Sequence, residues 1–85
     1  MIQIFTSDNC PYCISAKWFL KSMDIEYSEI NVSSDPSKLM EVVQISGMMT
    51  VPQIFVGEPT KESLIGWYDD MIALHESGKF LEKLQ

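Results

Sequence analysis

The sequence predicts one α/β domain over residues 1–85, with its strands and helices in the order β-α-β-α-β-β-α. Two observations lead to this fold class. The chain has 85 residues, enough for a single hydrophobic core. Segments in which apolar residues alternate, as in strands, are interleaved with segments in which they recur every three or four positions, as in helices. Because a β-α-β start requires a parallel strand pair with a right-handed crossover, we expect a four-stranded mixed sheet flanked by helices.

The first strand and helix follow from an alternation and a proline. Residues 2–7 carry large side chains toward both faces, which is typical of a strand in a covered sheet. Pro11 suits the first position of a helix, because the N–H that proline lacks would be unpaired there. Apolar residues then recur at helical spacing from Cys13 to Met23. We therefore expect a helix over residues 11–23.

The middle of the chain repeats this strand and helix pattern. Residues 25–32 alternate and predict the second strand. Asp35 and Pro36 are typical of a helix start, with Asp35 as the cap and Pro36 at the first helical position. The helix that they begin should end at Gly47, since glycine readily adopts the left-handed backbone that often follows a helix.

The last third of the chain predicts a hairpin and a final helix. Residues 51–56 form the third strand, led by Pro52, which sheets accept only at a strand start or an edge. Residues 63–66 form the fourth strand, which follows a turn and should pair with the third. Apolar residues at helical spacing from Asp69 to Leu84 predict one last helix.

The charge of the chain excludes several function classes. Twelve acids against six bases give a net charge of −6, and every base is lysine. Such a surface does not favour nucleic acid, whose affinity comes largely from Lys and Arg on phosphates. The chain holds no apolar run of the roughly 20 residues that span a membrane, and its start does not resemble a signal peptide. We therefore expect a cytoplasmic protein that binds neither nucleic acid nor membrane.

Cys10 and Cys13 have a spacing typical of a redox pair or of half a metal site. With Pro11 at the first helical position, Cys10 becomes the N-cap and accepts N–H bonds from Tyr12 and Cys13. These bonds and the positive end of the helix dipole favour the thiolate, so the pKa of Cys10 should lie below the free value of about 8.5. Cys13 lies one turn into the helix, on its apolar face, and should be buried.

A zinc site is the alternative to redox chemistry at this pair. Structural zinc takes four ligands, and His75 is the only other Cys or His in the chain. We therefore predict no metal site. Cys10 should be the nucleophile, whose thiolate attacks a disulfide sulfur to form a mixed disulfide. Cys13 or an external thiol should then attack Cys10 and release the reduced product.

Three segments resemble the dithiol glutaredoxins, and the resemblance covers nearly the whole chain. The segments are Cys10–Cys13 (Cys-Pro-Tyr-Cys), Thr50–Pro52 (Thr-Val-Pro) and Ile65–Asp70 (Ile-Gly-Trp-Tyr-Asp-Asp). The resemblance implies a thioredoxin-like fold with Pro52 in the cis form. It also implies a glutathione-dependent thiol–disulfide oxidoreductase that reduces protein disulfides and glutathione mixed disulfides, with roles in electron transport and cell redox homeostasis.

The same resemblance implies where glutathione binds. Val51 backbone groups would pair with the cysteine of glutathione, while the Tyr68 N–H and the Asp69 carboxylate would face its γ-glutamyl end. Glutathione would be a co-substrate, with no tightly bound cofactor. The partners would be disulfide-containing or glutathionylated proteins, with ribonucleotide reductase as one candidate, and the protein would act as a monomer. The glutathione-binding residues implied are Tyr12, Thr50, Val51, Pro52, Tyr68 and Asp69.

Three positions depart from the pattern of the family. Ser7, Leu39 and Met49 stand where the family often has Lys, Gln or Arg, and Arg, so polar or positive character is lost where the carboxylates of glutathione usually bind. A second interpretation therefore stays open, a glutaredoxin-like electron donor reduced by thioredoxin reductase. A third is a dimer that holds an iron–sulfur cluster through Cys10 and external glutathione.

Three more side chains allow two interpretations each. Trp67 replaces a glycine of the family, and it either gates the glutathione groove or packs under the last helix. Asp69 binds an amine, caps the last helix, or does both. Trp18, beside Ile14, forms a partner surface or packs along its own helix, and we favour packing.

Overall fold

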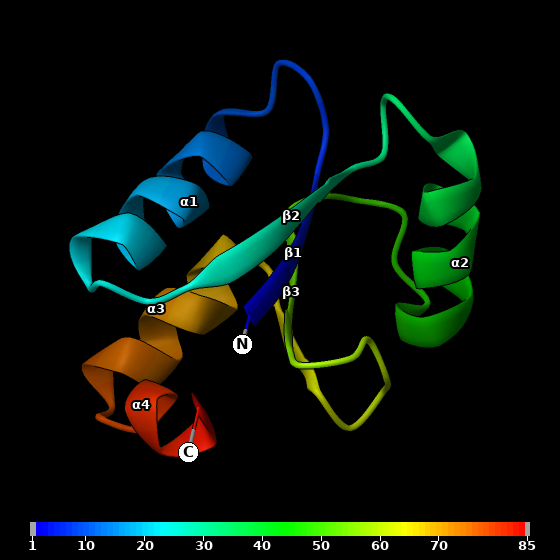
Figure 1. Cartoon of the computed structure of the whole chain (residues 1–85). Helices are drawn as coiled ribbons and strands as arrows, with labels where there is room; N and C mark the ends of the chain where they lie inside the picture. The colour runs from blue at the N-terminus through cyan, green and yellow to red at the C-terminus, as the bar shows by residue number, and fades with distance from the viewer. Residues whose placement is uncertain (1, 85) are drawn as a thin grey trace.

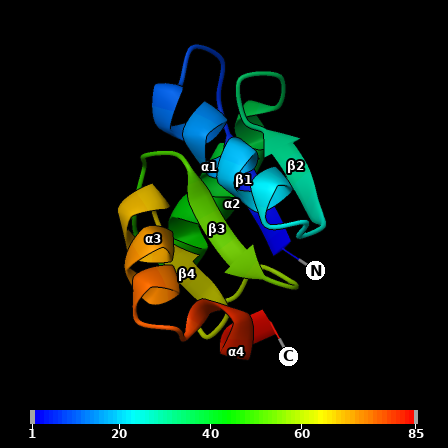
Figure 2. The ribbon, with the colours of Figure 1, turned by 90° about the vertical axis from the view of Figure 1, so that its left-hand side faces the viewer.

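The protein is a four-stranded sheet covered by helices on both faces, as a computed structural model of residues 2–84 describes it (Figure 1). The sheet order is β2-β1-β3-β4 (Figure 2). β1 and β2 are parallel, whereas β3 is antiparallel to both β1 and β4. The predicted α/β class, mixed sheet and strand order along the chain are therefore confirmed. The strands are β1 (Ile2–Thr6), β2 (Tyr27–Asn31), β3 (Gln53–Val56) and β4 (Leu64–Gly66).

The helices divide unequally between the two faces of the sheet. α1, α3 and α4 lie on one side and α2 lies alone on the other (Figure 1). This arrangement places the starts of α1 and α3 near each other at one end of the sheet. The helices are α1 (Pro11–Ser22), α2 (Pro36–Ser46), α3 (Tyr68–Glu76) and α4 (Phe80–Leu84).

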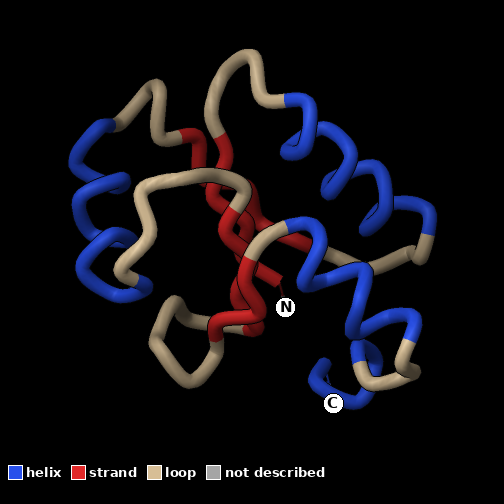
Figure 3. The backbone as a smooth tube through the Cα atoms, turned by 180° about the vertical axis from the view of Figure 1, so that it is seen from behind, coloured by secondary structure: helices blue, strands red, loops and turns tan. Residues whose placement is uncertain are grey.

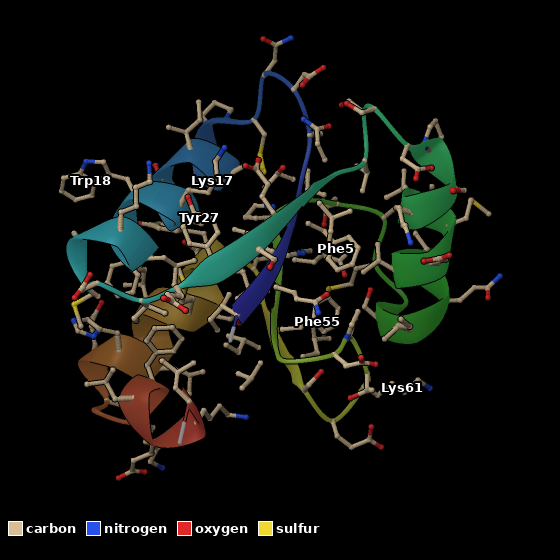
Figure 4. The ribbon with its side chains drawn as sticks, in the orientation of Figure 1. Phe5, Lys17, Trp18, Tyr27, Phe55 and Lys61 are labelled. Carbon is tan, nitrogen blue, oxygen red and sulfur yellow. A yellow bond between two sulfur atoms is a disulfide. The ribbon has the colours of Figure 1, made fainter. Side chains whose placement is uncertain are left out.

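The core has two parts because successive strand residues point to opposite faces. Ile4 packs with Leu20 of α1 and Met71 of α3 on one face. Its neighbour Phe5 packs with Phe55 on the α2 face, where the two rings meet edge to face with centroids 5.5 Å apart (Figure 4). Each fully buried side chain of this size contributes roughly 1.5–3 kcal/mol. The strands that carry the site are therefore held from both faces.

The predicted last helix is wrong in one respect, because the structure has two helices there. α3 ends at Glu76, and Gly78 has φ +78°. The Gly78 N–H donates to the His75 carbonyl and the Lys79 N–H to the Leu74 carbonyl, a pattern of hydrogen bonds that ends a helix. The chain then turns and begins α4.

Other element boundaries differ by one or two residues. β2 begins at Tyr27 rather than at residue 25, and Pro52 lies just before β3 rather than inside it. Asp35 occupies the N-cap position of α2, but its side chain makes no cap hydrogen bond. Instead it accepts a hydrogen bond from the Ser37 hydroxyl. Asp35 therefore lies at the predicted N-cap position, but its side chain does not accept a hydrogen bond from the first turn of α2.

The loop that leads from β1 to the cysteine pair is tied to the loop after β2. The Asn31 side chain donates to the Asp8 carboxylate over 3.0 Å, and the Asp8 N–H donates to the Ser33 hydroxyl over 3.0 Å. Asn9 follows with φ +57°, a left-handed backbone that asparagine tolerates better than most residues. These contacts set the position from which Cys10 begins α1.

Candidate active site

The cysteine pair lies at the start of α1, as predicted. Cys10 is the N-cap, with extended backbone (φ −111°, ψ 100°), and its Sγ accepts the Cys13 N–H over 3.1 Å. Cys13 is buried on the inner face of α1, whereas Cys10 is partly exposed. The two sulfurs form a disulfide in this structure. The two cysteines can therefore exist as a disulfide or as two thiols, and only Cys10 is partly exposed to solvent.

The loop before β3 brings its backbone to the cysteine pair. The Val51–Pro52 peptide bond is cis, as the resemblance implied. The Val51 carbonyl oxygen lies 3.9 Å from Cys10 Sγ. Because Cys10 carries no proton in the disulfide, this is a contact in the oxidised state and becomes a possible hydrogen bond only after reduction. Main-chain groups of this loop therefore border the reactive sulfur.

Gln53 holds this loop in place, a role that the sequence analysis missed. Its side chain is fully buried, and Nε2 donates to the carbonyls of Met48 and Thr50, each over 2.8 Å. Among the residues that the structure describes, Oε1 has no hydrogen-bond partner. The available signal was a glutamine inside an otherwise apolar strand segment. A polar residue in such a segment must find its partners nearby, and here they belong to the loop.

A cleft of about 240 Å³ lies next to the cysteine pair. It forms where the loop before β3 approaches the start of α3, two segments that Figure 3 shows near each other from behind. The rings of Tyr12 and Tyr68 approach from α1 and α3, with centroids 6.2 Å apart. The structure thus brings all six residues of the implied glutathione site into one cleft and adds Trp67. The lining residues are Tyr12, Thr50, Val51, Pro52, Trp67, Tyr68 and Asp69.

The start of α3 shows where Trp67 lies and which of two adjacent aspartates caps the helix. Trp67 is 42% exposed and lines the cleft, so it does not pack under the last helix. The Trp67 N–H donates to the Asp70 carboxylate over 2.8 Å. Asp70 therefore caps the helix, and Asp69 is left exposed at the cleft. Gly66 makes room for this cap, because a Cβ at its position would overlap the Asp70 carboxylate.

The three positions that depart from the family pattern have different surroundings. Leu39 packs against the core on the α2 face. Met49 is 71% exposed and directly precedes Thr50 of the cleft, while Ser7 is half-buried just after β1. No lysine is among the residues that line the cleft within the described range 2–84. Lys38, which directly precedes Leu39 in the sequence, lies on α2, where its Nζ is 3.4 Å from Glu41 Oε2.

Trp18 and Ile14 lie on the outer side of α1. Its side chain is 71% exposed and that of Ile14 is 63% exposed, so the two do not pack into the protein. Figure 4 shows Trp18 projecting outward from α1. The reason lies in the turn of the helix, because Ala16 and Leu20 already occupy the face that meets the sheet. His75 lies in the last turn of α3, with its ring centroid 5.0 Å from that of Phe19.

Residues 2–84 show neither a metal centre nor a membrane-spanning helix. In that range there is no group of three or more His, Cys, Asp and Glu side chains placed to hold a metal ion. Across the same residues, every helix is too short or too polar to cross a membrane.

Comparison with known proteins now decides the family. The glutaredoxin family model matches residues 2–59, which include the cysteine pair and the loop before β3. A glutaredoxin of Pseudomonas aeruginosa is 37% identical over 78 residues, covering 92% of this chain and 88% of that protein. The chain belongs to the glutaredoxin family. It is therefore a thiol–disulfide oxidoreductase.

Other glutaredoxins agree in sequence and in shape. Glutaredoxin 3 of Escherichia coli K12 is 36% identical over 77 residues, covering 91% of this chain and 88% of that protein. The solution structure of a glutaredoxin from Brucella melitensis is 37% identical and superposes with a TM-score of 0.81, covering 98% of this chain and 86% of that chain. The thioredoxin-like fold of a glutaredoxin is thus shown, and with it the glutathione-dependent oxidoreductase class.

Proposed function

We propose that Cys10 is the nucleophile and Cys13 the resolving thiol of a glutathione-dependent reductase. In the reduced protein, the Cys13 N–H and the positive end of α1 stabilise a negative charge on Cys10 Sγ. The thiolate attacks one sulfur of a substrate disulfide, the substrate S–S bond breaks, and its second sulfur leaves as a thiolate that takes up a proton. This N-cap geometry, with Cys10 partly exposed and Cys13 buried, is the observation that carries the proposal.

Two routes then release Cys10. The Cys13 thiolate attacks Cys10 Sγ, which expels the second substrate thiol and leaves the Cys10–Cys13 disulfide. Alternatively, a glutathione thiolate attacks the glutathione sulfur of a Cys10 mixed disulfide, which frees Cys10 and yields glutathione disulfide. After the first route, two glutathione molecules reduce the Cys10–Cys13 disulfide. They leave as glutathione disulfide, and the enzyme returns to its starting state. In each route the electrons come from glutathione.

The proposed place for glutathione is the cleft beside Cys10. The Val51 backbone lies beside the reactive sulfur and offers strand-like hydrogen bonds to the cysteine of glutathione. The Tyr68 N–H and the Asp69 carboxylate face the γ-glutamyl group, since Asp69 is free of the capping role. The remaining walls come from Tyr12, Thr50, Pro52 and Trp67. A carboxylate that faces an ammonium forms one of the stronger kinds of hydrogen bond.

The proposed partners are disulfide-containing or glutathionylated proteins, with the enzyme acting as a monomer. A two-cysteine chain that relies on a reduced thiol pool fits a cytoplasmic location, with a role in electron transport and redox homeostasis. Ribonucleotide reductase stays a candidate substrate from the resemblance alone.

A second candidate function rests on the missing positive charge. Since no lysine of residues 2–84 lines the cleft, a donor reduced by thioredoxin reductase instead of glutathione fits the same fold. The test couples reduction of a glutathionylated peptide to NADPH oxidation, once with glutathione and glutathione reductase and once with thioredoxin reductase. We expect turnover only in the first system. Turnover in the second alone would favour the second candidate.

A further inference from the structure

The cleft beside Cys10 carries formal negative charge and no formal positive charge. Asp69 is the one carboxylate among its described lining residues, and none of the described lysines is among them. Lys17 lies 2.9 Å from Glu29 of β2, a position visible in Figure 4. Lys61 lies in the loop after β3, far from α1 in the same view. The other lysines are Lys21 in the last turn of α1, Lys38 on α2, Lys79 before α4 and Lys83 within α4.

The two helix ends at the cleft do not make up for this lack of positive charge. The positive end of α1 already serves Cys10, whose sulfur accepts the Cys13 N–H. The positive end of α3 carries two carboxylates in its first turn, Asp69 and Asp70. A helix end is equivalent to roughly half an elementary charge, so two carboxylates more than cancel it. An anionic ligand therefore meets main-chain N–H groups and, among the described residues that line the cleft, no lysine.

Aromatic rings make up much of the remaining wall. The rings of Tyr12 and Tyr68 are tilted by 41° with centroids 6.2 Å apart, and both line the cleft together with Trp67. The negative faces of such rings attract cations and not anions, by about 0.5–1 kcal/mol at exposed sites. The rings, and the absence of lysine from the described residues that line the cleft, therefore favour a ligand end that is positive or neutral over one that is negative.

We propose that this cleft selects its thiol co-substrate by charge and prefers γ-glutamyl peptide thiols whose distal carboxylate is masked as an ester or amide, or replaced by an ammonium. The inference rests on the proposed function, since it assigns the substrate class of the same site. The γ-glutamyl group keeps its own partners, because its ammonium faces Asp69 and its carboxylate the Tyr68 N–H. Glutathione itself remains a substrate, but its glycine carboxylate gains no ion pair here.

The test compares three symmetric disulfides that differ in net charge. They are glutathione disulfide, the disulfide of the glycyl ethyl ester, and the disulfide of a glycyl 3-aminopropylamide. Cys13→Ser protein is mixed with each one, and formation of the Cys10 mixed disulfide is followed by rapid quench and intact mass. Each rate constant is divided by that for dithiothreitol with the same disulfide, which removes differences in intrinsic reactivity.

The expected order is aminopropylamide, then ester, then glutathione disulfide, with about a two- to threefold step between neighbours at low salt. The steps should shrink in 0.5 M NaCl, because exposed charges are screened within roughly 4 Å at that ionic strength. An equal rate, or a faster rate with glutathione disulfide, would overturn the charge selection alone. No acceleration of any disulfide over its solution reaction would overturn the proposed function, and this inference with it.

Two matched substitutions separate the cleft from the net charge of the protein. Met49 is 71% exposed beside the cleft, and Met40 is 58% exposed on α2 and does not line it. Met49→Lys should raise the relative rate of glutathione disulfide by about threefold, whereas Met40→Lys should leave the order and the steps unchanged. Equal shifts in both variants would show that the overall charge of −6 sets the preference, and would overturn selection by the cleft. No shift in Met49→Lys would overturn it as well.

Discussion

The side-chain amide of Gln53 donates a 2.8 Å hydrogen bond to the carbonyl of Thr50, across the loop that brings Val51 to Cys10. The same nitrogen donates to the Met48 carbonyl, so one buried group binds two carbonyls of the loop between α2 and β3. Gln53 does not line the cleft. Its effect on glutathione must therefore pass through the position of the loop backbone.

Gln53→Met should lower stability and weaken glutathione binding together. The variant keeps the length of the side chain and removes both donors, and a buried polar group left unpaired costs about 1–3 kcal/mol. Urea unfolding should show this loss, and KM for glutathione should rise more than kcat falls. Gln53→Glu should be worse, because it places a carboxylate oxygen against two carbonyls. A stability loss with unchanged KM would show that the loop keeps its position without Gln53.

Cys10→Ser should abolish every disulfide reduction, whereas Cys13→Ser should lose only part of the activity. In the second variant external glutathione still resolves the mixed disulfide, so reduction of a glutathionylated peptide should persist. Reduction of protein disulfides should fall strongly, because the resolving thiol is absent. The two substrates are assayed side by side with both variants. An equal loss in both variants would contradict the assigned roles.

Asp69 and Asp70 should respond differently to the same substitution. Asp69→Asn should raise KM for glutathione by about fivefold, the equivalent of ~1 kcal/mol, with little change in melting temperature. Asp70→Asn should mainly lower stability, because the amide is a weaker acceptor for the Trp67 N–H and no longer offsets the helix dipole, at a cost of about 0.5–1 kcal/mol. Steady-state kinetics and thermal unfolding of both variants decide this. The reverse pattern would exchange the two roles.

Glu29 should make stability depend on pH below neutrality. A hydrogen bond from Thr6, and then the Lys17 ammonium, lower the pKa of Glu29 from its ordinary 4.5. A depressed carboxyl pKa contributes stability above the unfolded pKa, and this stability is lost as pH falls through the lower folded value. Because the side chain is about a third exposed, we expect only ~0.5–1 kcal/mol.

Glu29→Gln tests this dependence directly. The variant should be less stable than the parent in urea at pH 7, and the difference should shrink as pH falls through the lowered folded pKa of Glu29. Lys17→Met should reproduce only part of the loss, since the Thr6 hydroxyl is the larger cause. A difference that persists unchanged at pH 3 would mean that packing, and not charge, explains it.

Features that depend on a few neighbouring residues were predicted correctly from the sequence. Cys10 is the N-cap because Pro11 starts the helix, and a cap bond spans only three residues. The burial of Cys13 follows from the same helical turn. The first strand pair follows from alternation and from the handedness of the crossover.

Features that depend on an exact boundary were harder to predict. The last helix was expected from Asp69, but α3 begins at Tyr68. That shift of one residue puts Asp70 at the third helical position, where its carboxylate reaches the Trp67 N–H. Asp70, and not the Asp69 that the sequence analysis considered, therefore caps α3. A preference for acids at a helix start cannot distinguish two adjacent aspartates.

By itself, the sequence determined which residues carry the chemistry, because the spacing of Cys10 and Cys13 on a helix start is a local property. Only the tertiary structure decided what surrounds them. The cleft is built from residues 12, 50–52 and 67–69, which meet because β3 pairs with β1 on one side and β4 on the other. The same fold leaves every described lysine outside the residues that line the cleft. The charge felt by a ligand depends on distances between such remote segments, and these distances exist only in the folded chain.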